Sequence, residues 1–271
     1  MIISASRRSD IPACFGDWLM QRVDAGAVEV PNPFSKAVYT VPLQPESTAA
    51  IVFWSKNYKP FLPKLNLLEQ KGFDKFLFNF TITGLPEILE PNIPPPENTI
   101  EDFKYLSLRY WKGHIFWRFD PILITGLTSE QFFLDRFRWI ADRIAPFTQR
   151  CIFSFAFFYE KVKRSLKLLQ EEKNLTYIDP NLERKRALAV RLGMLAAEYG
   201  LTLQSCCCEY LEDLSGIEKA HCVDGELVSA MWGGRYRYAL KPSREGCGCA
   251  ESADIGSYGT CQGGCVYCYA R

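Results

Sequence analysis

The sequence predicts an α/β fold built on a parallel sheet, most simply a (β/α) barrel, full or partial. Three observations support this. Short apolar runs alternate with amphipathic segments through most of the chain. The 271 residues match one barrel domain, which typically has about 250 residues. Hydrophobic residues make up 48% of the chain, enough to bury a large core. An open doubly wound sheet is the structural alternative.

Several short segments rich in Ile, Phe, Val or Leu are the expected strands. Some are apolar on both faces, as are strands that helices cover. The segments are Ile2–Ala5, Ile51–Trp54, Phe76–Ile82, His114–Phe119, Cys151–Phe157 and Leu201–Ser205. Residues Ala37–Leu43 are expected to add a strand or a hairpin. Because strands that alternate with helices pair in parallel through right-handed crossovers, the segments predict one parallel sheet.

Amphipathic segments between the strands predict helices. These are Phe15–Ala25, Pro60–Lys71, Phe132–Ile144 and Asn181–Tyr199. The first, second and fourth are followed by Gly26, Gly72 and Gly200, and glycine is the usual residue just past a helix end. The pair Thr128 and Gln131 predicts a capping box at the start of the third.

The organisation changes near residue 209. Before it, the proline-rich segment Pro91–Asn98 resembles a linker, but the strand–helix rhythm resumes afterwards, so we expect a stiff loop within one domain. From Glu209 onward Gly, Cys and Tyr replace the rhythm. We therefore expect a barrel over residues 1–208 and an irregular cysteine-rich tail over 209–271, packed across the barrel mouth as part of a single structural unit.

Charge and composition narrow the protein class. The 32 Lys and Arg residues balance 31 Asp and Glu residues, which leaves no global field to attract nucleic acid or membrane. No apolar run reaches the roughly 18 residues that span a bilayer, and the start MIISASRRSD is unlike a signal peptide. We therefore expect a cytoplasmic protein. In that reducing compartment, 11 cysteines indicate metal or redox chemistry rather than disulfides.

The motif C-x3-C-x2-C near the end of the chain consists of Cys261, Cys265 and Cys268. Gly263 and Gly264 allow the sharp backbone path that brings three thiolates together. A structural zinc site normally uses four ligands in paired C-x2-C units. Three cysteines with uneven spacing instead suit a 4Fe–4S cluster with one iron left for a non-protein ligand.

The segment CQGGCVYCYAR resembles the signature of the radical S-adenosylmethionine superfamily, in which an aromatic residue precedes the third cysteine, here Tyr267. Its wording is most similar to the branch that contains spore photoproduct lyase. The whole chain, with SRRSDIP, NPF, FWSKN, WRFDP and DIGSYGTC, resembles the family called domain of unknown function 1848. That resemblance names no substrate.

The superfamily resemblance implies a radical enzyme. An open iron would bind the amino and carboxylate groups of S-adenosylmethionine, and Tyr267 would lie beside the adenine. The reduced cluster would generate a 5′-deoxyadenosyl radical that abstracts hydrogen from an unidentified substrate. An electron donor such as flavodoxin or ferredoxin is therefore an expected partner. In most of the superfamily the motif follows the first barrel strand, whereas here it ends the chain, so the tail must return to the barrel mouth.

A second group of cysteines has enough members for another metal site. The four expected ligands are Cys207, Cys222, Cys247 and Cys249. Within the run Cys206–Cys208, Cys207 is the preferred ligand, and His221 is a further candidate. This group would hold an auxiliary 4Fe–4S cluster or a structural zinc ion. The alternative is that some of these thiols are buried and pack as small hydrophobic side chains.

Polar residues that follow the expected strands face the active-site mouth of a parallel barrel. The candidates for cofactor binding are Tyr267, Arg7, Arg8, Asp10 and Lys56. The basic members would grip a carboxylate or phosphate, and Asp10 would orient them or bind ribose hydroxyls. Arg118 and Asp120 are the candidate catalytic residues, because burying two charges inside an apolar run is costly unless they are paired or functional. A salt-bridge ring that closes the mouth is the alternative.

The leading functional hypothesis is a radical S-adenosylmethionine enzyme. The alternative is a zinc-stabilised nucleic-acid-binding or structural module, whose aromatic residues and arginines would stack on bases and contact phosphates. A third hypothesis is an iron–sulfur electron carrier, which needs neither a large barrel nor an open iron. The sequence contains no P-loop and no G-x-G-x-x-G motif, so kinase and Rossmann interpretations lack support.

Overall fold

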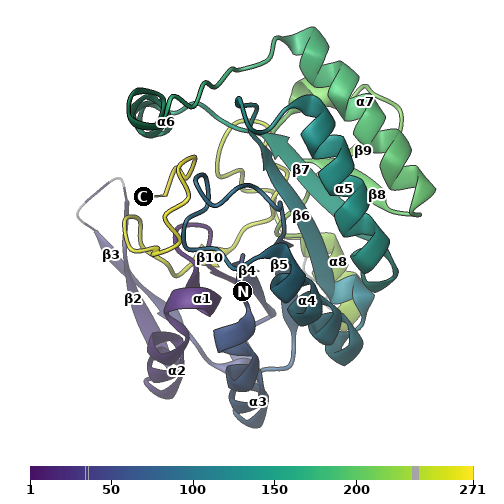
Figure 1. Cartoon of the computed structure of the whole chain (residues 1–271). Coiled ribbons are helices and arrows are strands. Elements are labelled where there is room, and N and C mark those ends of the chain that lie inside the picture. Colours follow the sequence, from purple (N-terminus) through teal and green to yellow (C-terminus); the bar gives the residue numbers. More distant parts are fainter. Residues whose placement is uncertain (34, 36, 234–237, 271) are drawn as a thin grey trace.

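A computed structural model describes residues 1–33, 35, 37–233 and 238–270. Phe34 of NPF and Arg271 at the end of CQGGCVYCYAR lie outside these residues. In the described part the chain forms an eight-stranded parallel sheet in the order β10-β1-β4-β5-β6-β7-β8-β9 (Figure 1). The strands are β1 (Ile2–Ala5), β4 (Ala50–Ser55), β5 (Phe76–Thr81), β6 (Ile115–Ile122), β7 (Arg150–Phe155), β8 (Thr202–Ser205), β9 (Ile217–Lys219) and β10 (Ala253–Asp254).

The helices flank this sheet. They are α1 (Ile11–Cys14), α2 (Gly16–Asp24), α3 (Leu62–Gln70), α4 (Pro96–Tyr110), α5 (Glu130–Ile144), α6 (Glu160–Lys173), α7 (Leu182–Glu198) and α8 (Gly225–Trp232). Figure 1 shows α3, α4, α5 and α7 packed along the outside of the sheet. The prediction of an α/β fold with a parallel sheet is confirmed. The pairings within the described strands leave β9 and β10 as the two edges.

The two faces of the sheet bury different sets of residues. Alternate residues of one strand point to opposite faces. Phe53 and Phe78 therefore belong to the large aromatic core beneath the helices, whereas their neighbours Val52 and Leu77 belong to a second, smaller cluster. We call the helix-covered side the outer face and the other the inner face. The inner face is covered by α8 and by cysteines of the tail.

The expected strands are confirmed with small shifts in their ends, and so are the four expected helices. Residues Ala37–Leu43 contain β3 (Val38–Pro42), which pairs in antiparallel fashion with β2 (Ala27–Pro31). The predicted capping box at Thr128 is wrong by one residue. Ser129 caps α5, since its hydroxyl accepts a hydrogen bond from the Phe132 N–H at 3.1 Å. The Thr128 hydroxyl instead donates a hydrogen bond to the Leu123 carbonyl at 2.6 Å.

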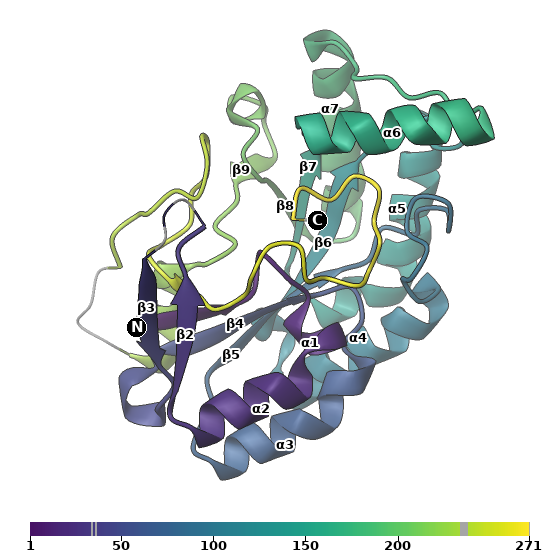
Figure 2. The ribbon, with the colours of Figure 1, turned by 90° about the vertical axis from the view of Figure 1, so that its left-hand side faces the viewer.

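The tail is more ordered than the sequence predicts. It carries β9, α8 and β10, and the two strands of this set occupy opposite edges of the sheet. With three residues in β9 and two in β10, these strands are too short to show a repeating apolar pattern. The sequence therefore predicts an irregular tail. After β10 the chain runs across the carboxyl-terminal end of the sheet, between α1 and α6 (Figure 2).

Two further features bear on the sequence predictions. Residues 91–95 lie in the connection between β5 and α4, and α4 begins at Pro96, a favoured residue for the first helical turn. Among the described helices, none has both the length and the apolar character that crossing a membrane requires.

Candidate functional site

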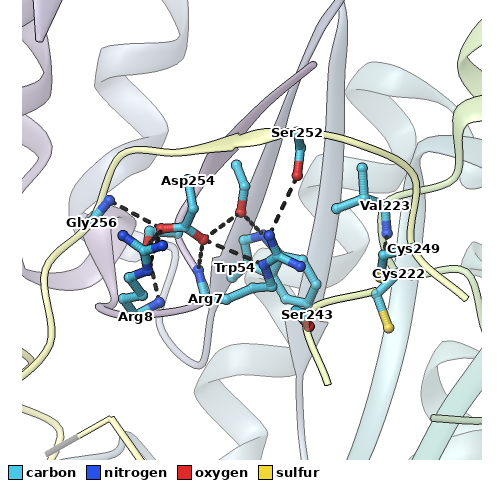
Figure 3. A network of polar contacts seen from close by, with 12 residues as sticks. Arg7, Arg8, Trp54, Cys222, Val223, Ser243, Cys249, Ser252, Asp254 and Gly256 are labelled. Atoms are coloured by element: carbon cyan, nitrogen blue, oxygen red, sulfur yellow. Dashed lines mark hydrogen bonds and ion pairs between the residues drawn. The ribbon is translucent and has the colours of Figure 1, made fainter. Parts of the chain in front are cut away.

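Asp254 fixes the last strand against the first (Figure 3). Its carboxylate is buried and accepts hydrogen bonds from the hydroxyls of Ser4 at 2.9 Å and Ser6 at 2.5 Å. The backbone N–H groups of Arg7 and Gly256 donate to it at 2.8 and 3.1 Å. A buried carboxylate is tolerated only when such donors replace water. This network holds β10 beside β1 and so sets where the following segment begins.

The guanidinium groups of Arg7 and Arg8 approach the same carboxylate. The Nε atoms of Arg7 and Arg8 lie 3.4 and 4.0 Å from Asp254, so both predicted cofactor-binding arginines are ion-paired within the protein. The predictions did not include Asp254, because its partners lie about 250 residues earlier in the chain. The partly buried arginines still line a cavity at the carboxyl ends of the strands.

The cysteine loop, residues Cys261–Cys268, brings Cys261, Cys265 and Cys268 together after β10. Gly263 lies between two of the thiols, since a Cβ atom there would stand 3.5 Å from Cys261 Sγ and 3.8 Å from Cys265 Sγ. Two backbone N–H groups point at sulfur, Gly263 at Cys261 Sγ (3.5 Å) and Ala270 at Cys268 Sγ (3.4 Å). Burial raises the pKa of Cys265 to about 12, an effect that Lys56 partly offsets.

Neighbouring loops hold the cysteine loop in place. The Val266 N–H donates to the Leu89 carbonyl at 3.1 Å, and the Asn92 side chain donates to the Gln262 carbonyl at 2.8 Å. Both partners come from the segment between β5 and α4, and Asn92 lies within the predicted stiff proline-rich loop. On the other side, the hydroxyl of Thr260 contacts that of Ser9 at 2.8 Å.

A polar triad lies next to the cysteine loop. The phenol of Tyr267 donates to Glu90, and Lys56 Nζ lies 2.9 Å from the same carboxylate oxygen. Burial raises the pKa of Tyr267 well above its ordinary value, and the charge of Glu90 adds to this. Burial would lower the pKa of Lys56, but Glu90, with smaller contributions from Cys265 and Asp120, outweighs this effect, so that the pKa is raised. Lys56 and Glu90 also line a cavity of about 380 Å³ with Thr81, Ile82 and Thr83.

Glu90 and Cys14 belong to this region but were not predicted. Glu90 sits in a loop whose sequence, PEILEP, gives no sign that its carboxylate is buried. Cys14, at the end of α1, approaches Cys261, and the pKa of Cys14 is raised, mainly by burial. Asp10 has a structural contact here: its carboxylate accepts from the N–H groups of Ala13 (2.9 Å) and Lys56 (3.2 Å).

The second cysteine group forms a closed ring of thiol contacts, which we call the thiol ring. Its members, in order around the ring, are Cys206, Cys207, Cys247, Cys249 and Cys222. All four ligands predicted for a second site are present, and Cys206 joins them. The Cys208 thiol does not, since it packs in the outer-face core and contacts the Cys206 carbonyl at 3.5 Å. The thiol ring is buried against the inner face.

Arg118 and Asp120, the predicted catalytic pair, lie beside the thiol ring. They form an ion pair with each other, and the Ser154 hydroxyl donates to Asp120. Arg118 Nη1 also donates to Cys222 Sγ at 2.9 Å, and its guanidinium lies over the Trp54 ring at 5.3 Å. Arg118 thus connects a carboxylate to the thiol ring.

Arg244 approaches the thiol ring from the tail. Its Nε donates to Cys207 Sγ at 2.9 Å, and its guanidinium lies 4.3 Å from the centre of the Phe157 ring. A cavity of about 1050 Å³ extends from this region to the network around Asp254, and ring cysteines line it together with Arg7, Asp120 and Asp254. In the part of the chain that the structure describes, no three His, Cys, Asp or Glu side chains are positioned to hold a metal ion.

Comparison with known proteins identifies a family but no biochemical activity. No curated protein sequence matches the chain. Among solved structures, the chain is similar to the crystal structure of dihydropyrimidinase from Brevibacillus agri NCHU1002, at 14% identity and a TM-score of 0.29. That match covers 60% of this chain and only 35% of the other. Its TM-score is too low to support a conclusion about this protein. The family described as domain of unknown function (DUF1848) matches residues 2–270. The chain therefore belongs to the DUF1848 family.

Proposed function

We propose that the protein is a radical S-adenosylmethionine enzyme whose 4Fe–4S cluster is held by Cys261, Cys265 and Cys268. One observation carries the proposal. The last strand in sequence, β10, takes the edge position beside β1, so that the cysteine loop follows the first strand of the sheet in space. In this proposal, the place of β10 beside β1 would give the motif a spatial position equivalent to the one that it has after the first barrel strand in most of the superfamily.

The finer architecture in this proposal is a partial barrel. The order of parallel strands runs from β10 to β9, the long helices pack on the outer face, and α8 with the tail covers the inner face. Doubly wound sheets instead carry crossover helices on both faces. In a barrel the carboxyl ends of the strands form the active-site mouth, where both the cysteine loop and the two cavities are found.

The cysteine loop suits a cluster with one open iron. It supplies three thiols from one short segment, and the absence of a side chain at Gly263 lets the backbone pass close to two of them. The N–H groups of Gly263 and Ala270 stabilise negative charge on sulfur. When bound, the cluster would supply the electron that splits S-adenosylmethionine into methionine and a 5′-deoxyadenosyl radical.

The protein's own residues would bind and orient the cosubstrate. Lys56 and Glu90 provide the two opposite charges that an amino-acid group needs, at the wall of the smaller cavity. Tyr267 is held in one orientation by its hydrogen bond to Glu90. The larger cavity, with Arg7, Arg8 and Asp120 at its wall, is the proposed substrate chamber. We propose an electron donor such as flavodoxin or ferredoxin and a cytoplasmic location as the setting for this chemistry.

The test is anaerobic purification followed by assay of 5′-deoxyadenosine with dithionite and S-adenosylmethionine. The wild-type protein should be brown, contain iron and sulfide, and form 5′-deoxyadenosine. Cys265→Ala should abolish product formation, whereas Cys151→Ala, which removes a thiol buried in the outer-face core, should retain it. A colourless, zinc-containing wild-type protein without product would favour the zinc-stabilised module instead.

A further inference from the structure

We propose that the thiol ring is a second metal site, in which four of its five thiolates bind one zinc ion. This site is separate from the cysteine loop and does not depend on the radical chemistry. The thiol ring draws on three distant parts of the chain: Cys206 and Cys207 directly after β8, Cys222 shortly after β9, and Cys247 and Cys249 before β10. A metal ion there would therefore fasten the tail to the inner face of the sheet.

The backbone is shaped to place two adjacent thiols on one face. Successive residues of a strand normally point to opposite faces. Cys206 and Cys207 nevertheless both belong to the inner-face cluster, and Cys208 belongs to the outer face. The alternation is broken at Cys207, whose φ of 57° lies in the left-handed region. For a residue other than glycine this conformation costs on the order of 1 kcal/mol and is found mainly where function requires it.

Two sulfur–sulfur distances in the thiol ring are close to those around a single tetrahedral ion. Cys206 Sγ lies 3.7 Å from Cys207 Sγ and 3.6 Å from Cys222 Sγ. Four sulfurs bound to zinc at about 2.3 Å stand roughly 3.8 Å apart at the corners of a tetrahedron. In a 4Fe–4S cluster each cysteine binds a different iron, which sets the ligand sulfurs farther apart. The observed spacing therefore favours one ion over a cluster.

The charge beside the thiol ring fits thiolates rather than thiols. Zinc binding would release four protons and leave a centre with a net charge of −2. Two guanidiniums already donate to ring sulfurs, Arg118 to Cys222 and Arg244 to Cys207, both at 2.9 Å. Arg118 is buried, and a buried cation is stabilised far better by thiolates than by neutral thiols.

The first test measures metal content in a full-length chain that lacks the other site. The triple variant C261A/C265A/C268A should be colourless and contain about one zinc per chain. Adding C247S and C249S to it leaves three ring thiols, and zinc should fall at least tenfold. Adding Cys208→Ser instead, which removes a neighbouring thiol outside the thiol ring, should leave zinc unchanged. Iron in the triple variant, or no bound metal, would overturn the proposal.

A second measurement separates metal loss from misfolding. Cobalt(II) added to the metal-depleted triple variant should give the visible and near-ultraviolet bands of tetrahedral thiolate coordination. Those bands should be lost with C247S and C249S while circular dichroism still reports the folded sheet. Bands that persist in that variant would show that the ion binds elsewhere and would overturn the proposal. Because the three thiols of the cysteine loop are absent from every variant here, a negative result would not bear on the proposed radical chemistry.

Discussion

The cysteine loop and the thiol ring use the same residue type in opposite settings. In the cysteine loop, three thiols come from one short segment, and Cys261 and Cys268 are only half buried. In the thiol ring, five buried thiols come from distant segments and sit beside two arginines. The cysteine loop supplies three thiols, one fewer than a closed four-ligand site uses, whereas the thiol ring supplies five, one more than such a site needs. A site with one position left for a non-protein ligand suits catalysis, and one whose positions are all filled by the protein suits structure.

The two sites also depend on the fold in different ways. The geometry of the cysteine loop is largely local, although β10 and the proline-rich loop decide where it lies. The thiol ring exists only after β8, β9 and the tail have come together. The following variants separate these dependences, beginning with the residue on which both sites rely.

Asp254→Ala should have the largest effect, because Asp254 lies between the two cysteine groups and anchors β10. The substitution leaves the hydroxyls of Ser4 and Ser6 and the charge of Arg7 without their buried partner. The loss of one partner of such a buried pair costs about 3–5 kcal/mol. Urea unfolding should show this loss, and both metal contents should fall. A variant that unfolds at the wild-type urea concentration would contradict the anchoring role of Asp254.

Removal of zinc from the thiol ring should destabilise the chain. A ligand present at 1,000 times its Kd stabilises the folded state by about 4 kcal/mol, and the thiol ring joins three segments. Thermal unfolding of the triple variant C261A/C265A/C268A should therefore shift downward when a zinc chelator is added. The same chelator should not shift the variant that also carries C247S and C249S. Equal shifts in the two proteins would show that the thiol ring is not the chelator's target.

Asp10 should make the region beside the cysteine loop sensitive to pH. Burial raises the pKa of Asp10 to about 6, above the value of about 3.9 for an unfolded aspartate. Because the folded pKa is the higher one, protonation favours folding. The resulting stability is complete below about pH 4 and is lost as the pH rises through 6. Relative to Asp10→Asn, the wild-type protein should lose up to about 2 kcal/mol of unfolding free energy between pH 4 and 7. A constant difference across this range would refute the raised pKa.

Cys14→Ser should have the smallest effect. Cys14 approaches Cys261, but a cluster with one open iron needs no fourth thiolate. Iron content and 5′-deoxyadenosine formation should stay near the wild-type values. Loss of iron in this variant would make Cys14 a fourth ligand, which would close the cysteine loop and remove its difference from the thiol ring.

The sequence predicts features that depend on local pattern. Buried apolar runs such as Phe76–Ile82 identify strands, and the spacing of Cys261, Cys265 and Cys268 identifies one candidate site. What it misses depends on contacts between distant residues. Asp254 and Glu90 resemble ordinary loop carboxylates until the fold supplies their partners. The presence of Cys206 and Cys207 on the same face depends on one backbone angle at Cys207, which no periodicity encodes.

The central claim is that the cysteine loop holds a cluster with an open iron. The most direct measurement is electron paramagnetic resonance of the reduced variant C247S/C249S, in which the thiol ring has lost two of its five thiols and the cysteine loop is intact. We expect a 4Fe–4S signal that changes shape when S-adenosylmethionine is added and that disappears with the further change Cys265→Ala. A signal that ignores S-adenosylmethionine, or one that survives Cys265→Ala, would contradict the account.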